Sequence, residues 1–199
     1  MGDSSPITFS DIEITKNIDN KIMRDLRRYY VEGGTYFFTV VTSNRRGILC
    51  LPQSRDALKK AIIQVRKKYP FEILAWVLLP DHLHCIWTLP LDDCDFSLRW
   101  RLIKRNYSFL MKDVLSVSKS DSQKKKQESG FWQRRFWEHV IKDENDLAKH
   151  FDYVHFNPVK HGLVENLYDW KWSTYHRYLK MGYYNREQIV KDYKDIGHE

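Results

Sequence analysis

The sequence predicts an α+β fold in which a central antiparallel, ferredoxin-like sheet carries helices mainly on one face. Segments rich in β-formers alternate with amphipathic segments in the order β-α-β-β-α-β-α along the chain. Two of the strand-like segments follow each other across a Pro-Asp break, which indicates a hairpin. A hairpin inside such an alternation is typical of a split βαβ sheet.

Four segments have the composition of strands. Residues 35–42 are mostly β-branched or aromatic and follow two glycines, so they predict a strand. Residues 71–79 and 82–87 are separated by the Pro-Asp pair and form the predicted hairpin. Residues 132–141 predict the fourth strand.

Three helices are expected. One spans about residues 54–68 and a longer one about residues 96–115, each with an apolar stripe at helical spacing. A third follows Asp143, whose side chain can cap its first turn, and runs to about Asn157. We expect it to end there, because Pro158 restricts the conformation of the residue before it.

A chain of 199 residues is expected to form one domain with tails. We place that domain at residues 25–180, after a loosely ordered N-terminal extension at residues 1–24 and before a C-terminal tail at residues 181–199. Within the domain, residues 116–130 are crowded with Ser and Lys and predict a mobile basic loop.

The excess of 33 Lys and Arg over 26 Asp and Glu gives a formal net charge of +7, which favours polyanionic partners without specifying one. The three cysteines show no paired spacing, so we expect a reducing compartment and no disulfides. No apolar run is long enough for a membrane span. These features lead us to expect a cytoplasmic protein.

Several enzyme classes lack their signature motifs here. The sequence has no P-loop, no GxSxG segment and no dinucleotide-binding fingerprint. The neighbours His84 and Cys85 do not predict a zinc site, because adjacent strand residues point to opposite faces and no further cysteine has ligand spacing.

His82 and His84 are candidate metal ligands. They are two residues apart on a predicted strand, so both side chains leave the same face and can converge on one ion. Leu83, Cys85 and Trp87 are expected on the other face. The alternative is that the two histidines merely alternate on a solvated strand face, a pattern that also arises by chance.

Tyr153 and Asn157 form a second candidate pair. They are four residues apart on a predicted helix and therefore share one face. Such a face could hold a phenol nucleophile and an amide oxygen ligand over one metal ion. The alternative is an ordinary helical tyrosine and an asparagine that ends the helix before Pro158.

A basic stripe follows the predicted helix at residues 96–115. Its side chains could track a phosphate backbone, and nearby Trp and Tyr residues could stack on unpaired bases. The alternative is a solvated charged face. The stripe consists of Arg101, Lys104, Arg105 and Lys112, with Lys124, Lys125 and Lys126 beyond it.

The chain contains five motifs in order: RRYY at residues 27–30, GGTYFFTV at 33–40, PDHLH at 80–84, FWEH at 136–139 and YVHFNPVKHGLV at 153–164. Together they resemble the REP-associated tyrosine transposases, relatives of the single-tyrosine insertion-sequence transposases. The resemblance covers about residues 24–180.

The resemblance implies an HUH nuclease fold. His82 and His84 match its metal-binding pair, Tyr153 matches the nucleophile, and Asn157 matches the third ligand. The expected ion is Mg²⁺ or Mn²⁺, because phosphate oxygens suit Mg²⁺ and a site with two imidazoles also suits Mn²⁺. The candidate DNA contacts are Arg27, Arg28, Arg101, Lys104, Arg105, Lys160 and His161.

The family implies a metal-dependent endonuclease and strand transferase acting on single-stranded DNA whose palindromes fold into hairpins. Tyr153 would attack phosphorus, expel a 3′-hydroxyl and stay joined to the 5′ end, with His155 or His150 as a candidate proton acceptor. One tyrosine performs one transesterification at a time, so a monomer or a homodimer could act. The resemblance also implies a domesticated bacterial enzyme, which we expect to be associated with the nucleoid.

Two other functions stay open at this point. A non-catalytic RNA- or single-stranded-DNA-binding module would present exposed aromatic pairs on its strands, and it leaves the histidine pair unexplained. A plasmid-type replication nickase would use the same chemistry. The motif at residues 153–164 favours the transposases over the nickases.

Overall fold

The computed structural model of the chain describes residues 29–115 and 130–184. The predicted N-terminal extension, nearly all of the predicted basic loop and most of the predicted tail lie outside these ranges. Arg27, Arg28 and Lys124 to Lys126 therefore also lie outside the described residues. The predicted domain limits at residues 25 and 180 stay predictions.

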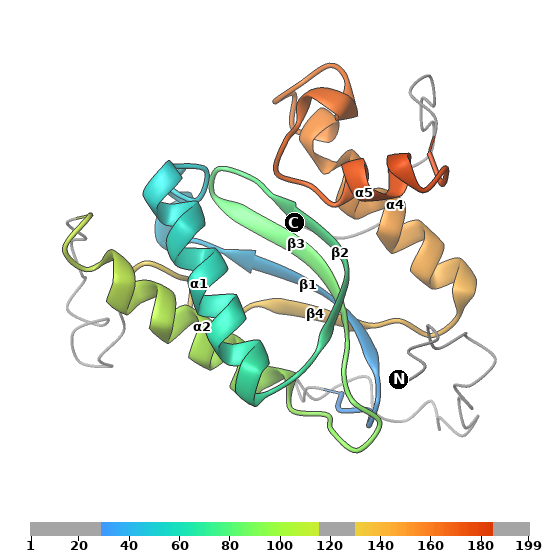
Figure 1. Cartoon of the computed structure of the whole chain (residues 1–199), viewed down its shortest axis with the longest axis horizontal. Coiled ribbons are helices and arrows are strands. Elements are labelled where there is room, and N and C mark those ends of the chain that lie inside the picture. Colours follow the sequence, from blue (N-terminus) through green and yellow to red (C-terminus); the bar gives the residue numbers. More distant parts are fainter. Residues whose placement is uncertain (1–28, 116–129, 185–199) are drawn as a thin grey trace, which may run out of the picture.

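A four-stranded antiparallel sheet forms the centre of the molecule (Figure 1). Its order is β2-β3-β1-β4, so β1 and β3 are the central strands. The predicted α+β class is confirmed, and so is the hairpin, in which β2 and β3 pair across the Pro-Asp break. The strands are β1 (Thr35–Val41), β2 (Glu72–Leu78), β3 (His82–Thr88) and β4 (Trp137–Val140).

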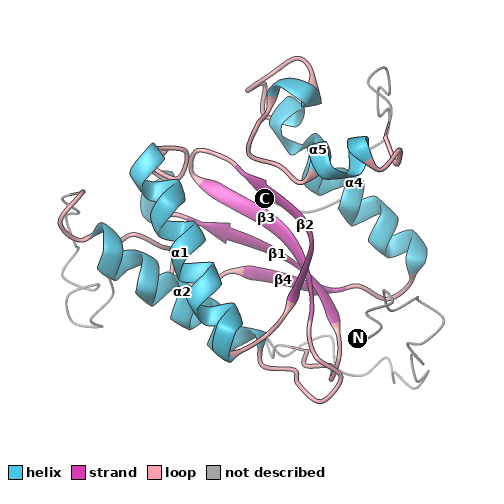
Figure 2. Cartoon of the chain, in the orientation of Figure 1, coloured by secondary structure: helices cyan, strands magenta, loops and turns pink. Residues whose placement is uncertain are grey.

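Helices lie on both faces of the sheet (Figure 2). Helices α1 (Pro52–Lys68) and α2 (Phe96–Met111) pack on one face, and α4 (Glu144–Lys160) packs on the other. Two of the long helices in the described ranges therefore share a face, as the sequence predicts. Because both faces are covered, β1 and β3 are buried along almost their whole length.

The alternation of side chains along the central strands supplies two apolar cores. Phe38 and Trp87 point toward α1 and α2, where the rings of Trp87 and Trp100 stack with centroids 4.3 Å apart. Phe37 points the other way and packs with Val154 of α4. Burying a side chain of this size contributes about 1.5–3 kcal/mol, so each core helps to hold its helices on the sheet.

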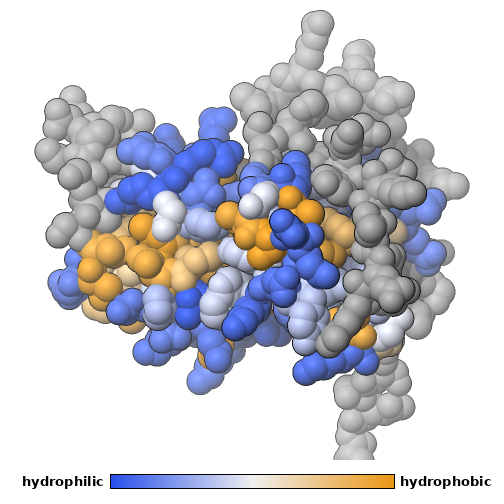
Figure 3. Space-filling view, turned by 90° about the horizontal axis from the view of Figure 1, so that it is seen from above, coloured by the Kyte–Doolittle hydropathy of each residue, from blue (hydrophilic) through white to orange (hydrophobic). Residues whose placement is uncertain are grey.

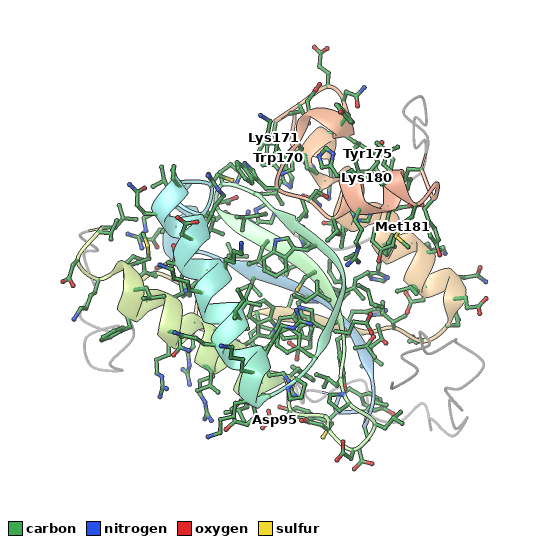
Figure 4. All side chains as sticks on the ribbon, viewed as in Figure 1. Asp95, Trp170, Lys171, Tyr175, Lys180 and Met181 are labelled. Atoms are coloured by element: carbon green, nitrogen blue, oxygen red, sulfur yellow. The ribbon has the colours of Figure 1, made fainter. Side chains whose placement is uncertain are left out.

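A buried arginine fixes the start of α2. The guanidinium of Arg99 is fully buried and donates hydrogen bonds to both carboxylate oxygens of Asp93, at 2.7 and 3.0 Å. These hydrogen bonds hold the pKa of Asp93 below its usual value, although burial raises it. Asp95, labelled in Figure 4, caps the helix by accepting a hydrogen bond from the backbone N–H of Leu98.

Two elements are shorter than predicted. The strand expected at residues 132–141 is reduced to β4, because the polar residues 133–135 are exposed and Trp132 forms only an isolated bridge with Thr42. The helix expected to reach residue 115 ends at Met111. The backbone N–H groups of Val114 and Leu115 both bond to the carbonyl oxygen of Met111, which closes the helix in a turn.

The prediction that Pro158 ends the third helix is wrong. Helix α4 continues through Pro158 to Lys160, because one proline removes a single N–H donor and the packed helix tolerates the loss. The chain turns out of the helix at Gly162, two residues after its end, where φ is +65°. The N–H of Gly162 bonds to the carbonyl of Val159 and that of Leu163 bonds to the carbonyl of Pro158, the pattern of a Schellman cap.

After α4 the chain returns along the outer edge of β2. Ser173 forms an isolated bridge with Val77, and the indole N–H of Trp170 donates a hydrogen bond of 3.0 Å to the carbonyl of Leu78. Trp170 and Tyr175 of this segment are labelled in Figure 4. The short elements of the chain are η2 (Ser43–Arg45), η3 (Leu167–Asp169) and α5 (Tyr175–Lys180).

Hydrophilic residues predominate on the face of the molecule drawn in Figure 3, with hydrophobic residues gathered in smaller areas between them. Among the helices that the structure describes, none combines the length and the apolar character needed to cross a bilayer. Cys50, Cys85 and Cys94 are free thiols, in agreement with the expectation of no disulfide.

Candidate active site

His82 and His84 lie side by side on the face of β3 that α4 covers. Their ring centroids are 4.9 Å apart, and the residues are 2% and 0% exposed. Leu83 and Cys85 belong to the core on the opposite face, so the predicted alternation is confirmed. Because both rings are buried, the alternative of two histidines on a solvated strand face is wrong.

Each histidine ring is fixed through its Nδ1 atom. The Nδ1 of His82 lies 2.6 Å from a carboxylate oxygen of Asp81, and the Nδ1 of His84 lies 2.9 Å from the hydroxyl of Thr39. Burial raises the pKa of Asp81, but the hydrogen bonds and charges of His82 and Arg45 outweigh it and hold the pKa below its usual value. With Nδ1 engaged in both rings, Nε2 is the nitrogen suited to coordinate a metal.

Helix α4 brings two further rings against this pair. The ring of Tyr153 lies 5.1 Å from that of His84, and the ring of His161 lies 5.0 Å from that of His82. Tyr153 is itself 2% exposed. The helix thus runs antiparallel to β3 across the histidines and brings together residues that are far apart in the sequence, as predicted.

Asn157 lies on the same side of α4, one turn after Tyr153 and one turn before His161. Since those two neighbours contact the rings of His84 and His82, this part of the helix faces the histidine pair. Asn157 is fully buried, and neither its Oδ1 nor its Nδ2 has a hydrogen-bond partner among the described residues. An unsatisfied buried amide costs about 1–3 kcal/mol, so it points to a ligand.

The residues present fit a divalent metal ion. The donor set of two imidazoles and one amide oxygen suits Mn²⁺ and, with oxygen atoms from a phosphate and water, Mg²⁺. A bound cation would satisfy the buried Oδ1 of Asn157, for which the protein supplies no donor in the described ranges. Asp81 and Thr39 hold the rings of His82 and His84 in place for such an ion.

Lys160 contacts the phenol of Tyr153. Its Nζ donates a hydrogen bond of 3.3 Å to the phenolic oxygen and lies 4.7 Å from the centre of the ring. From the sequence, Lys160 is predicted only as a DNA contact. A spacing of seven residues, which is two helical turns, is the signal that could have revealed the contact, but the predicted helix ends before Lys160.

The two histidines suggested as proton acceptors both bond to groups other than the phenol of Tyr153. His155 is 1% exposed, and its two ring nitrogens lie 2.9 and 2.8 Å from the hydroxyls of Tyr184 and Thr174. Burial lowers its pKa to about 3, so it is neutral at pH 7. The Nδ1 of His150 bonds to the backbone carbonyl of Asp146. His155 therefore serves the packing of the C-terminal segment.

A second group of side chains that could hold a metal ion was not indicated by the sequence. His139, Asp146 and His150 offer ligand atoms that all lie within 4.8 Å of one another. The group is already joined through Asp146, whose carboxylate accepts a hydrogen bond of 2.8 Å from His139 Nε2 and lies 2.9 Å from His150 Nδ1. These bonds tie β4 to the first turns of α4.

The basic stripe is not brought together with the histidine pair. Arg101, Lys104 and Arg105 lie on α2, which packs on the opposite face of the sheet. Lys104 donates a hydrogen bond of 3.0 Å to the carbonyl of Gln133. Of the candidate DNA contacts in the described ranges, Lys160 and His161 are the ones next to the site.

The aromatic side chains of β1 and β3 do not form the surface that a binding module of the RNA-recognition type needs. Tyr36, Phe37, Phe38 and Trp87 are all at most 1% exposed. Helices cover both faces of the central strands, so their aromatic rings are unavailable to stack on bases.

Residues 30–157 match a family model described as "Transposase IS200 like". The match begins shortly before β1 and ends at Asn157. It therefore includes both predicted histidine ligands, the predicted nucleophile and the buried amide.

Two curated proteins with similar sequences bear the name REP-associated tyrosine transposase, one of them provisionally. The first, from Escherichia coli K12, is 46% identical over 164 residues, which are 81% of this chain and 88% of that protein. The provisionally named one, from Haemophilus influenzae Rd, is 41% identical over 163 residues, which are 81% of this chain and 91% of that protein.

A solved structure of a REP-associated tyrosine transposase bound to a REP hairpin is also similar. It superposes with a TM-score of 0.71 and 44% sequence identity, covering 87% of this chain and 95% of that one. The similarity thus extends over nearly the whole of the solved chain.

Proposed function

Since this chain belongs to the family of IS200-like transposases, we propose that it cleaves and rejoins single-stranded DNA through a covalent bond to Tyr153. The observation that carries the proposal is the position of α4, which places Tyr153 and Asn157 across the paired histidines of β3. A nucleophile and metal ligands around one point are what phosphoryl transfer requires.

We propose His82, His84 and Asn157 as the protein ligands of a divalent ion. Enzymes of this family are generally metal-dependent, and Mg²⁺ or Mn²⁺ fits the donor set. When bound, such an ion supplies Lewis-acid stabilisation of the charge that develops on the phosphate oxygens. The second group, His139 with Asp146 and His150, lies outside this ligand set.

Tyr153 supplies the nucleophile. Its phenolic oxygen forms a bond to phosphorus while the bond from phosphorus to the 3′-oxygen breaks in line with it. The phenol loses one proton and the departing 3′-oxygen gains one, so the step is balanced. The 5′ end stays attached as a phosphotyrosine ester, and a 3′-hydroxyl rejoins the strand by the reverse step.

We propose hairpin-forming DNA of the REP type as the substrate. The solved relative that binds a REP hairpin is 44% identical to this chain over most of its length, which supports a shared substrate class. We propose that Lys160 and His161 contact the phosphate at the site, which is supported by their contacts with Tyr153 and His82. Such a substrate would place the protein in the cytoplasm, on the nucleoid.

Assays with end-labelled hairpin DNA test this function. Cleavage should require Mn²⁺ or Mg²⁺, stop in excess chelator and return when the metal is restored. His84→Gln should abolish cleavage, whereas His176→Gln, a matched change in α5, should leave it intact. Undiminished cutting in chelator would contradict the proposal.

A complete exchange needs two transesterifications, which either a monomer acting twice or a homodimer can supply. Light scattering of the protein with and without hairpin DNA separates these two cases. Its outcome decides how many copies of Tyr153 act on one substrate.

A further inference from the structure

Trp137 lies on the same face of the sheet as the histidine pair. It is paired with Thr39 across β4 and β1, and Thr39 is paired in turn with His84 across β1 and β3. Residues in such a row point to the same face, because side chains alternate in register across an antiparallel sheet. Two strand spacings, about 10 Å, therefore separate Trp137 from the proposed metal ligand.

The indole of Trp137 is exposed but supported by other rings. Trp137 is 43% exposed, and no other Trp in the described part of the chain is an exposed residue. Its ring meets that of Phe37 edge-on at 5.5 Å and lies parallel to that of His139 at 5.9 Å. Phe37 also contacts the rings of His84 and Tyr153.

This combination is not explained by packing. A tryptophan that served the core would be buried like Trp87 and Trp100, which are both fully covered. Trp137 instead exposes to solvent an aromatic ring that Phe37 and His139 hold in place, on the face of the sheet that carries the histidine pair. Arg134 and Arg135, just before it in the chain, are exposed and add positive charge to this edge.

We propose that Trp137 is a stacking platform for an unpaired base of the DNA strand, one close to the phosphate that is cleaved. The inference rests on the proposed function, since it places that phosphate at His82 and His84. Stacking on an aromatic face is tolerant of base identity, so Trp137 positions the strand and does not select its sequence.

Binding measurements with an abasic scan test this platform. The probe is a REP hairpin with single-stranded flanks, in which one flanking base at a time is removed. Binding is measured by fluorescence anisotropy in the Tyr153→Phe background, so the result does not depend on cleavage. Trp137→Ala should weaken binding of the intact probe about tenfold to a hundredfold.

The decisive comparison is whether removal of a base and the Trp137→Ala substitution weaken binding independently of each other. At one or two neighbouring positions, removal of the base should lower the affinity of the protein that keeps Trp137. The same removal should cause no further loss of affinity in Trp137→Ala. Trp137→Phe should restore most of the affinity, because it keeps an aromatic face. Phe109→Ala, a change at an exposed ring of α2, should have no such effect.

The proposal would be overturned if the losses of affinity from base removal and from Trp137→Ala multiplied at every position. Unchanged binding by Trp137→Ala would also overturn it. Circular dichroism of Trp137→Ala and Trp137→Phe shows whether both variants keep the fold. Cleavage of hairpin DNA is measured separately, with the parent protein that keeps Tyr153. Failure of that protein to cleave would contradict the proposed function and not the stacking platform.

Discussion

The ammonium nitrogen of Lys160 lies 3.3 Å from the phenolic oxygen of Tyr153, two turns further along the same helix. A free phenol has a pKa of about 10, so forming the phenolate at pH 7 costs about 4 kcal/mol. A neighbouring cation offsets part of that cost by stabilising negative charge on the attacking oxygen. Lys160 therefore fits a role in activating the nucleophile beyond that of a general DNA contact.

Lys160→Met should slow single-turnover cleavage about tenfold to a hundredfold, the loss expected when a hydrogen bond to a charged group worth about 1.5–3 kcal/mol is removed. Hairpin binding should change much less. Lys180→Met, at the end of α5, is a control that removes a lysine away from the phenol. Equal losses of binding and of rate in Lys160→Met would show that this lysine only attracts DNA.

Asn157→Leu should have opposite effects on stability with and without metal. Without metal, the variant should be about 1–3 kcal/mol more stable than the parent, because it removes a buried amide that lacks partners in the described ranges. With saturating Mn²⁺ the parent should gain stability and the variant should gain far less. Urea denaturation in both conditions measures the four values.

An Asn157→Leu protein that is less stable in the absence of metal would contradict this account of the buried amide. Comparison with Asn166→Leu, at the cap of η3, controls for the general cost of replacing an asparagine.

Thr39→Val should weaken Mn²⁺ binding about tenfold to a hundredfold, the usual effect of removing a hydrogen bond that orients a metal-binding histidine. The change keeps the shape of the side chain and removes only the hydroxyl that holds His84. Thr35→Val is the matched control on β1, because its hydroxyl bonds to Thr88 and not to a histidine. Calorimetric titration gives both affinities, and equal values for the two variants would count against the proposed ligand set.

His155 makes stability depend on pH. Its folded pKa of about 3 lies below the unfolded value of about 6.5, because burial opposes the charged form. Stability is therefore complete above pH 6.5 and is lost as pH falls, since the unfolded chain binds a proton that the folded chain excludes. At pH 5 the expected loss is about 2 kcal/mol.

His155→Gln should remove this share of the acid sensitivity. The variant is expected to be less stable at pH 7.5, yet to lose less stability than the parent between pH 7.5 and pH 5. Urea midpoints at the two pH values measure the difference. An identical pH dependence in parent and variant would exclude His155 as its source.

The parts of the fold that follow a simple period could be predicted from the sequence. Alternation with a period of two places His82 and His84 on one face of their strand. The helical period places Tyr153 and Asn157 on one face of their helix. Which face of the sheet the last helix covers could not be derived from these periods. That choice depends on tertiary contacts such as that between the rings of Tyr153 and Phe37.

The contacts that could not be predicted depend on where helices end and on how far long side chains reach. The sequence suggested that Pro158 ends the helix, so Lys160 was not placed two turns after Tyr153. The segment after Gly162 has no sustained period, and its order comes from tertiary contacts. Burial of His155 against Tyr184 and Thr174 illustrates this, because neither partner lies near it in the sequence.

The most direct test of the central claim is the detection of a covalent complex between Tyr153 and DNA. Hairpin DNA labelled on the fragment that carries the new 5′ end is incubated with the protein and Mn²⁺, and the products are separated under denaturing conditions. We predict a labelled protein band whose modified peptide contains Tyr153, and no such band with Tyr153→Phe, which should still bind the hairpin. A labelled adduct that persists in Tyr153→Phe would contradict the account.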